Sequence, residues 1–294
     1  MSNRTRALGA VLTGLLILAG AGCGSDDSSA DSSGAASAAK YPDAAKLLPA
    51  ELRDKGTLVA AMADNFPPEH FREGGKLTGF NPDFSQALAE GLGLKVELAG
   101  INFEAIIPGL QAKRYDVGIA AVFITDERQK VVDFVSYFNE GSSLVVDAEK
   151  SLGINSIADV CGYRAALEKG TAHVSEIEEQ SAKCEASGKK PVRLQMYAKQ
   201  SEASLALTSG QADFLAFTTP AATWAAKSNP RFRVVEQYTS YPAGIVVPKG
   251  EGDLARAIQL AVQEMIKDGS YQTILEKWGM QAGAITDPQI LPNP

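Results

Sequence analysis

Histidine, cysteine and net positive charge are scarce in this chain. Its 294 residues include two histidines and three cysteines, and the formal net charge is −7 with a pI near 5.1. The histidines and cysteines show none of the short paired spacings that a zinc site uses. No dense basic patch favours nucleic acid or an anionic membrane surface. We therefore expect no metal, no cofactor and no nucleic-acid partner.

The amino terminus lacks an apolar run long enough to be a membrane-spanning helix. The apolar stretch at residues 7–21 is shorter than the roughly 20 residues that such a helix needs, and Arg4 and Arg6 precede it. This order is typical of an export signal. We expect residues 1–22 to be a signal peptide and the mature protein to act outside the cytoplasm.

Small residues lead into Cys23 directly after this signal. Residues 21–25 resemble the lipobox of bacterial lipoproteins, in which the cysteine becomes the lipidated first residue, although Gly20 stands where that motif prefers leucine. The alternative is a plain secretory signal with a chance cysteine. The following stretch is rich in Ser, Asp, Ala and Gly and is too polar to pack. We expect a lipidated cysteine and a flexible membrane tether over residues 23–45; an ordinary disordered terminus is the alternative.

Cys161 and Cys184 remain as a pair once Cys23 is assigned to the lipid. An exported protein meets an oxidising compartment, in which a disulfide persists. The bond would add about 3 kcal/mol to stability by restricting the unfolded chain. Two free buried thiols are the alternative.

From Gly56 onward, short apolar runs alternate with amphipathic helical stretches, which is the pattern of an α/β fold. The tail after residue 280 looks irregular. We expect strands at 57–62, 95–98, 117–122, 163–167, 192–196, 214–217, 233–236 and 243–247, and helices at 83–92, 103–111, 125–132, 172–186, 201–209, 220–229, 254–267 and 271–278.

The alternation falls into two blocks of similar size. Polar or Gly-rich stretches near 140–143 and 238–244 separate them, which indicates two lobes joined by two crossings, with a ligand cleft between the lobes. We expect the first part of lobe 1 at 46–142, lobe 2 at 143–238, the return to lobe 1 at 239–280 and a C-terminal tail at 281–294.

Eight motifs appear in an order that resembles the polar amino-acid family of periplasmic-type solute-binding proteins of ABC importers. The resemblance covers essentially the whole mature domain. It implies the type II two-lobed fold, with the lobes closing over one small molecule that is then delivered to a membrane permease. The motifs are FPP at 66–68 with Phe71, GKLTGFNPD at 75–83, FEAIIPGL at 103–110, RYDVG at 114–118, TDER at 125–128, KGT at 169–171, GQAD at 210–213, and DGSY at 268–271 with KWG at 277–279.

The resemblance assigns the ligand's α-carboxylate to Arg128, whose planar guanidinium can hold a carboxylate with two hydrogen bonds. Gly170 and Thr171 would complete that site with an N–H and a hydroxyl at the start of a helix. The alternatives are a surface arginine that pairs with Asp126 or Glu127, and a simple helix cap at Thr171.

The resemblance also assigns Ala121 to the ligand site, and Phe66 and Phe103 to aromatic walls around the ligand. Phe123 is a departure, because many relatives keep a small hydroxyl residue at its position. With Phe66 and Phe103 it would form an aromatic box for a delocalised or alkylated cation; packing into the core is the alternative.

A second departure concerns the ligand's α-ammonium. The family presents an acidic residue at the position of Thr218 and often another at the position of Ala63, and this chain has neither. Asp64 could substitute only if its loop shifts. Glu69 and His70 are expected near the rim of the cleft, with solvated surface positions as the simpler interpretation.

We therefore expect an extracytoplasmic, lipid-anchored binding protein that captures an amino acid or related small carboxylate. A binding protein for a cationic compatible solute or a modified amino acid is the alternative. A dehydratase-like enzyme on the same fold would need a cleft acid or base. The candidate acids and bases form no recognisable pair in the sequence, so we expect no enzyme. These candidates are Asp64, His70, Glu168 and His173.

Overall fold

The computed structural model of the protein describes residues 38–292. The expected signal peptide and Cys23 lie outside the described residues. In the described range, no helix combines the length and apolarity needed to cross a membrane.

The packed domain begins at Tyr41, before the boundary at residue 46 that the sequence suggested. Helix α1 (Pro42–Lys46) follows at once, with proline in its first turn, where a missing N–H costs nothing. The Tyr41 ring lies against the backbone of Gly91, and its hydroxyl donates to Asp268 Oδ2 at 2.7 Å. Residues 41–45 therefore belong to the packed domain and not to the expected tether, because the aromatic side chain of Tyr41 is buried.

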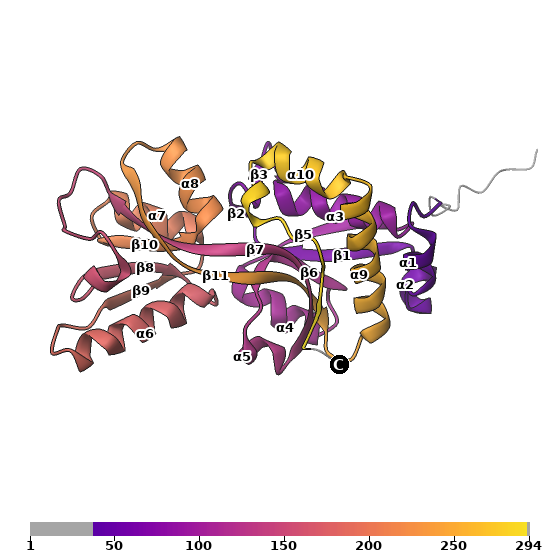
Figure 1. The fold of residues 1–294 in the computed structure, drawn as a ribbon, viewed down its shortest axis with the longest axis horizontal. Helices are drawn as coiled ribbons and strands as arrows, with labels where there is room; N and C mark the ends of the chain where they lie inside the picture. Colours follow the sequence, from indigo (N-terminus) through magenta and orange to yellow (C-terminus); the bar gives the residue numbers. More distant parts are fainter. Residues whose placement is uncertain (1–37, 293–294) are drawn as a thin grey trace, which may run out of the picture. The chain divides into compact units, whose positions relative to one another are not determined.

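Lobe 1 is built on parallel strands that are covered by helices (Figure 1). A separate antiparallel sheet of three short strands carries the first expected ligand residue, Phe66. The elements are α2 (Ala50–Lys55), β1 (Thr57–Met62), β2 (Asn65–Phe66), β3 (His70–Glu73), β4 (Lys76–Thr78), α3 (Phe80–Gly91), β5 (Lys95–Gly100), η1 (Phe103–Ala105), α4 (Ile106–Gln111), β6 (Val117–Phe123), α5 (Asp126–Gln129), α9 (Gly252–Lys267), α10 (Ser270–Trp278), η3 (Gln281–Gly283) and β12 (Ile290–Leu291).

Lobe 2 repeats the pattern with three parallel strands between helices. Cys161 and Cys184 form the expected disulfide, which ties the loop before β8 to helix α6 with 5.6 Å between the Cα atoms. The elements are η2 (Ile157–Asp159), β8 (Arg164–Glu168), α6 (Ala172–Ala186), β9 (Arg193–Tyr197), α7 (Gln200–Thr208), β10 (Phe214–Thr218) and α8 (Thr219–Ser228).

Two long antiparallel strands, β7 (Val132–Asp147) and β11 (Phe232–Pro248), join the lobes and place all the larger strands in one sheet, in the order β5-β1-β6-β11-β7-β10-β8-β9. Figure 1 shows both strands running through the middle of the molecule from one lobe to the other. The polar or Gly-rich stretches expected at the two crossings, 140–143 and 238–244, lie inside these strands, where Glu140 pairs with Tyr241 and Ser142 with Thr239. The crossings are therefore paired strands, which limits the directions in which the lobes can bend.

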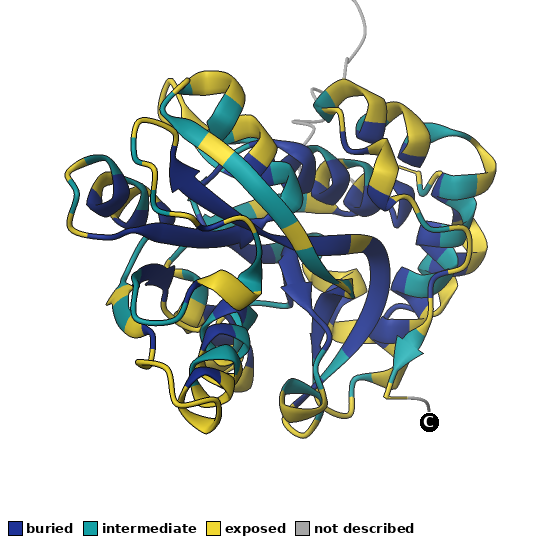
Figure 2. Cartoon of the chain, turned by 60° about the vertical axis from the view of Figure 1, so that its left-hand side comes forward, coloured by how far each residue is buried: buried dark blue, intermediate teal, exposed yellow. Residues whose placement is uncertain are grey.

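Burial follows this layering (Figure 2). Strands β6, β7, β8 and β10 of the large sheet are almost wholly buried, whereas its edge strands β5 and β9 and the outer helices keep exposed residues. One apolar cluster fills lobe 1 and two fill lobe 2, on β10 and its neighbours. Phe66, which belongs to the lobe 1 sequence, packs in a lobe 2 cluster against Phe217. The lobes are therefore in contact around the expected cleft.

The expected strands and helices are present, but the structure also contains elements that were not expected, among them α1, α2, β2, β3 and β4. Strand β7 was not expected, because Asn139, Glu140 and Gly141 interrupt its apolar pattern. Strands expected at 233–236 and 243–247 are one strand, β11, which contains register shifts. The tail is not irregular throughout, since Ile290 and Leu291 pair with β7 as strand β12.

Candidate ligand-binding site

A small cavity lies between the two lobes, and the centre of a water-sized sphere can reach about 20 Å³ of it. The lining residues come from β2, the loop after it, β3, η1, β6 and α5 of lobe 1 and from β8, α6 and β10 of lobe 2. They are Phe66, Glu69, His70, Phe103, Ala120, Ala121, Phe123, Arg128, Glu168, Thr171, Ala172, His173 and Thr218.

Arg128 is held in this cavity by the backbone of both lobes. The Thr125 hydroxyl caps helix α5 by accepting from the Arg128 amide, which fixes the start of the helix. The guanidinium donates from Nη1 to Phe123 O at 2.7 Å and from Nη2 to Gly170 O at 2.8 Å, and its Cζ lies 5.7 Å from the centre of the Phe103 ring. Burial lowers the pKa of Arg128 to about 10, so the group stays cationic at neutral pH. It does not pair with Asp126 or Glu127.

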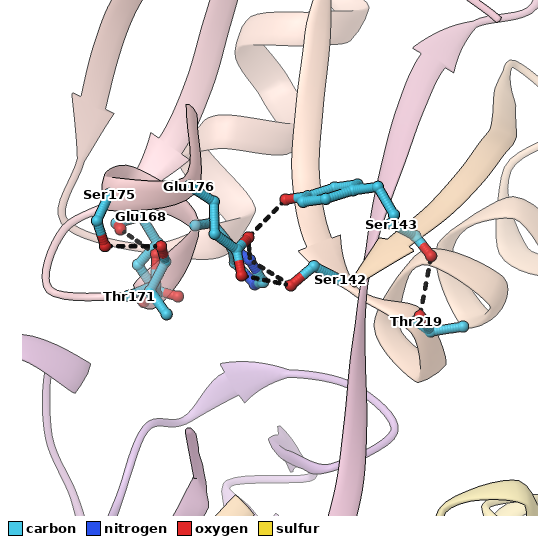
Figure 3. Close-up of polar contacts among 10 residues, drawn as sticks. Ser142, Ser143, Glu168, Thr171, Ser175, Glu176 and Thr219 are labelled. Carbon is cyan, nitrogen blue, oxygen red and sulfur yellow. Dashed lines mark hydrogen bonds and ion pairs between the residues drawn. The ribbon is translucent and has the colours of Figure 1, made fainter. Parts of the chain in front are cut away.

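Gly170 and Thr171 lie where helix α6 begins, but their polar groups are used differently from the expectation. The Thr171 hydroxyl donates to Glu168 O at 2.8 Å (Figure 3), and the Gly170 carbonyl accepts from Arg128. Gly170 has φ +78°, and a Cβ there would lie 3.0 Å from Glu104 Cα. A side chain at this position would therefore keep the lobes apart.

The three aromatic residues line the cavity, but their rings are already in contact with other groups. Phe66 stacks on His70 at 5.6 Å with an interplanar angle of 16°. The Phe103 ring carries the Arg128 guanidinium, and Phe123 packs edge-on against His173 at 5.6 Å. The faces that an alkylated cation would need are thus partly occupied.

Thr218 binds a carboxylate instead of supplying one. Its hydroxyl donates to Glu69 Oε1 at 2.6 Å, and Glu69 is fully buried. Glu69 and His70 are therefore not solvated surface residues as expected, with exposed fractions of 0% and 1%. The pKa of Glu69 is raised to about 8, mainly by burial and also by the charge of Glu168, and the Thr218 hydroxyl opposes this rise.

Glu168 brings a second buried carboxyl group to the cavity from the end of β8. It is 2% exposed, and its Oε1 receives no hydrogen bond from the described residues. Burial raises the pKa of Glu168 to about 8, and the charges of Glu104 and Glu202 add to the rise. A cationic group in the cavity would satisfy this oxygen and favour its ionised form.

A buried chain of hydrogen bonds sets the protonation of His70. The Ala121 amide donates to Tyr137 Oη at 3.0 Å, and the Tyr137 hydroxyl donates to Asn81 Oδ1 at 2.6 Å. Asn81 Nδ2 is thereby the donor to His70 Nδ1 at 2.8 Å, which leaves the proton of the neutral ring on Nε2. Burial lowers the pKa of His70 to about 3, so the ring is neutral at physiological pH. Ala121 itself has φ +49°, an uncommon conformation that clusters at functional sites.

His173 is the second imidazole in the cavity wall. Its Nδ1 lies 3.2 Å from Glu176 Oε2, and Glu176 also accepts from Ser142 at 3.0 Å and from Tyr238 at 2.7 Å (Figure 3). Burial acts to raise the pKa of Glu176, but its donors outweigh burial and the pKa is lowered. Glu176 therefore has its own donors and is not available to a ligand.

The structure brings seven of the eight expected ligand residues to one cavity, and Gly170 lies beside it. Asp64 is directed elsewhere, since it pairs with Arg72 and Lys199. Three more residues of the cavity wall were not assigned to the ligand from the sequence. Glu69 was expected near the rim of the cleft, and Glu168 and His173 were considered only as acid or base candidates of an enzyme. In residues 38–292, no group of three or more His, Cys, Asp or Glu could hold a metal ion.

Residues 58–281 match the family of bacterial extracellular solute-binding proteins, family 3. The chain belongs to this family. The chain is 31% identical to the arginine-binding protein ArgT of Corynebacterium glutamicum. The alignment spans 257 residues, which are 86% of this chain and 84% of that protein. The solved structure of an ancestral arginine-binding protein bound to arginine is 36% identical, with a TM-score of 0.71, and covers 76% of this chain and 98% of that one.

Another similar solved structure is that of the ancestral amino-acid-binding protein AncCDT-1, a precursor of cyclohexadienyl dehydratase. It is 30% identical, with a TM-score of 0.71, and covers 78% of this chain and 97% of that one. These findings confirm the expected family and the two-lobed α/β fold. Family 3 proteins are extracytoplasmic solute-binding proteins, which agrees with a cavity between the lobes.

Proposed function

We propose that this protein is the extracytoplasmic binding component of an ABC importer and that it captures an amino acid. The observation that carries the proposal is Arg128, a cation that is held inside the cavity between the lobes. A ligand carboxylate that approaches this guanidinium gains charge-assisted hydrogen bonds worth about 1.5–3 kcal/mol. Lipidation of Cys23 would keep the protein near its permease.

The charges of the cavity favour a ligand with a basic side chain. Glu69 and Glu168 offer two carboxyl groups, whereas Arg128 is the one fixed cation among the residues that line the cavity. An amino acid such as arginine supplies one carboxylate and two cationic groups, which matches this set. The relatives named as arginine-binding proteins support the same ligand class.

Binding would act through closure of the lobes. Arg128 Nη2 already bonds Gly170 O, Lys199 Nζ lies 3.3 Å from Asp64 Oδ1, and the Gln200 amide donates to Asn65 at 2.9 Å. Each of these contacts joins lobe 1 to lobe 2. A ligand that bridges Arg128 and Glu168 adds a further contact between the lobes and shifts the protein toward the closed form. The permease would recognise this form.

A thermal-shift screen of residues 38–294 tests this function. The panel is the twenty amino acids, agmatine, the α-hydroxy analogue of arginine and glycine betaine. A ligand at about 100 times its Kd stabilises the folded state by about 2.7 kcal/mol, which raises Tm by several degrees. We expect L-arginine to raise Tm, Arg128→Ala to abolish the rise, and the exposed control Arg53→Ala to keep it. A rise with glycine betaine alone would overturn the amino-acid proposal.

Recovery of the ligand separates binding from catalysis. His70, His173 and Glu168 line one cavity, so a dehydratase-like activity has candidate groups there. Hydrogen bonds fix the two imidazoles for recognition, because His70 is neutral and bonded to Asn81, and His173 lies against Glu176. We expect mass spectrometry to recover bound L-arginine unchanged after prolonged incubation; conversion to a product would contradict a pure binding role.

A further inference from the structure

Glu69 and Glu140 form a pair of buried carboxyl groups beside the cavity. Both residues are 0% exposed, and Glu69 faces the cavity while Glu140 comes from β7 outside its lining. Each carboxyl group lies close enough to the other to shift its pKa. Glu69 Oε2 and both oxygens of Glu140 receive no N–H or O–H donor from residues 38–292.

Two adjacent carboxyl groups in an apolar setting cannot both be ionised, because each charge loses hydration and repels the other. One proton must therefore remain between them. Burial and the neighbouring Glu69 raise the pKa of Glu140 well above its usual range, whereas Glu140 lowers that of Glu69. Glu140 is thus the member of the pair that keeps its proton.

The backbone fixes Glu69 at the amino-terminal end of helix α3. The Asn81 amide donates to Glu69 O at 2.8 Å, and the Phe80 amide donates to Pro68 O at 3.0 Å. Gly79 has φ +128°, and a Cβ there would lie 2.5 Å from Glu69 O, so only glycine allows this approach. With Thr218 donating to Oε1, the carboxyl group of Glu69 is held in one orientation.

The groups facing this pair come from several elements. Thr218 lies on β10, Glu168 on β8 and Tyr137 on β7, while His70 on β3 is neutral and hydrogen-bonded to Asn81. Lys199 is bonded to Asp64. No cation from the described residues bonds to either carboxyl group of the pair. A cation for Glu69 must therefore come from the ligand.

We infer that Glu69 receives a cationic nitrogen of the ligand, that the carboxylic acid of Glu140 positions Glu69, and that each ligand bound displaces one proton from the pair into solvent. This inference rests on the proposed amino-acid-binding function. In the free protein Glu69 is a carboxylic acid. When the ligand enters with its ammonium or guanidinium already charged, the Glu69 O–H proton leaves to water and the carboxylate pairs with the ligand. Glu140 keeps its proton.

Isothermal titration of L-arginine at pH 7, in two buffers with different ionisation enthalpies, counts the protons released. Glu168 contributes its own proton, so the comparison is between Glu69→Gln and the matched exposed control Glu179→Gln. We expect Glu69→Gln to release about one proton fewer and to bind about 10–100-fold more weakly at pH 8. L-citrulline lacks the charged guanidinium of arginine, and the α-hydroxy analogue lacks the α-ammonium. Glu69→Gln should no longer weaken the binding of whichever analogue lacks the nitrogen that Glu69 receives.

Glu140 is tested by a conservative and a non-conservative change. Glu140→Gln keeps a polar group that can donate to Glu69, so we expect binding and proton release to be retained. Glu140→Leu removes that group, so affinity at pH 7 falls and the pH midpoint of binding moves upward. Thr218→Val, which removes the hydroxyl that donates to Glu69 at similar size, should move the midpoint the same way and serves as a second probe if Glu140→Leu fails to fold.

The outcomes separate the two proposals. Equal proton release and affinity in Glu69→Gln and Glu179→Gln, with Arg128→Ala still abolishing binding, would overturn this inference and leave the proposed function standing. If the wild-type protein binds neither L-arginine nor L-citrulline, the proposed function fails, and this inference fails with it.

Discussion

The buried carboxyl group of Glu168 should make the ligand-free protein less stable as pH rises from 6.5 to 8. Its ordinary pKa of 4.5 is raised to about 8 in the folded protein, first by burial and then by Glu104 and Glu202. The folded state therefore holds a proton that the unfolded state has lost. The stability linked to this proton is complete below the unfolded pKa and is lost as pH rises through the folded value.

The window from pH 6.5 to 8 isolates this effect from most other groups. His70 has a folded pKa of about 3 and an ordinary value of 6.5, so it contributes to the pH dependence only below 6.5. Carboxyl groups with lowered pKa values, such as those of Asp64, Asp147 and Asp213, contribute only in acid. A group that is fully protonated in the folded state and fully ionised in the unfolded state changes the free energy of unfolding by about 1.4 kcal/mol per pH unit. Across this window Glu168 should account for a loss of roughly 1.5–2 kcal/mol.

Calorimetry of ligand-free wild type and Glu168→Gln, with the exposed Glu179→Gln as control, measures this loss. We expect the Tm of wild type and control to fall by about 4–6 °C more than that of Glu168→Gln between pH 6.5 and 8. Glu69 adds its own fall to all three proteins, and this fall is slightly smaller in Glu168→Gln because the charge of Glu168 raises the pKa of Glu69. Parallel Tm curves for wild type and Glu168→Gln would refute the assignment of a raised pKa to Glu168.

Three further changes test other parts of the structure. Replacing Cys161 and Cys184 by serine should cost about 3 kcal/mol of unfolding free energy in denaturant titration, because the closed loop is released in the unfolded chain; an unchanged midpoint would contradict this. Gly170→Ala should weaken L-arginine binding without abolishing folding, since its Cβ meets Glu104 across the lobes and its φ is positive; unchanged affinity would refute the contact. Phe103→Ala should weaken L-arginine binding about 3–30-fold by removing the ring beneath the guanidinium, and a tighter complex would contradict that role.

Most of the fold could be predicted because local pattern and burial agree along most of the chain. Strand β1 and helix α6 have the predicted bounds, since each lies between clear turn signals. Strand β7 could not be predicted, because its polar centre is supported only by pairing with β11, a partner distant in the sequence. The end of the tether was misplaced for the same kind of reason, since Tyr41 is buried by Gly91 and Asp268.

The site was predictable where the motif itself carries the chemistry. Arg128 and the aromatic residues were identified by their motifs and share one cavity. Glu69 was expected either near the rim of the cleft or at the surface, because a carboxylate is normally solvated, and only the fold brings Thr218 and Glu140 beside it. The absence of an acidic residue at 218 was visible in the sequence, but the contact of Thr218 with a carboxyl group from another loop was not, because sequence spacing cannot show it.

Titration calorimetry of L-arginine into wild type and Arg128→Ala is the most direct test of the central claim, which places the ligand between the lobes on Arg128. We expect one site per chain in the wild type and affinity at least about 100-fold weaker in Arg128→Ala, because a buried carboxylate would lose its charged partner. Unchanged L-arginine affinity in Arg128→Ala would show that the ligand binds elsewhere and would contradict the account.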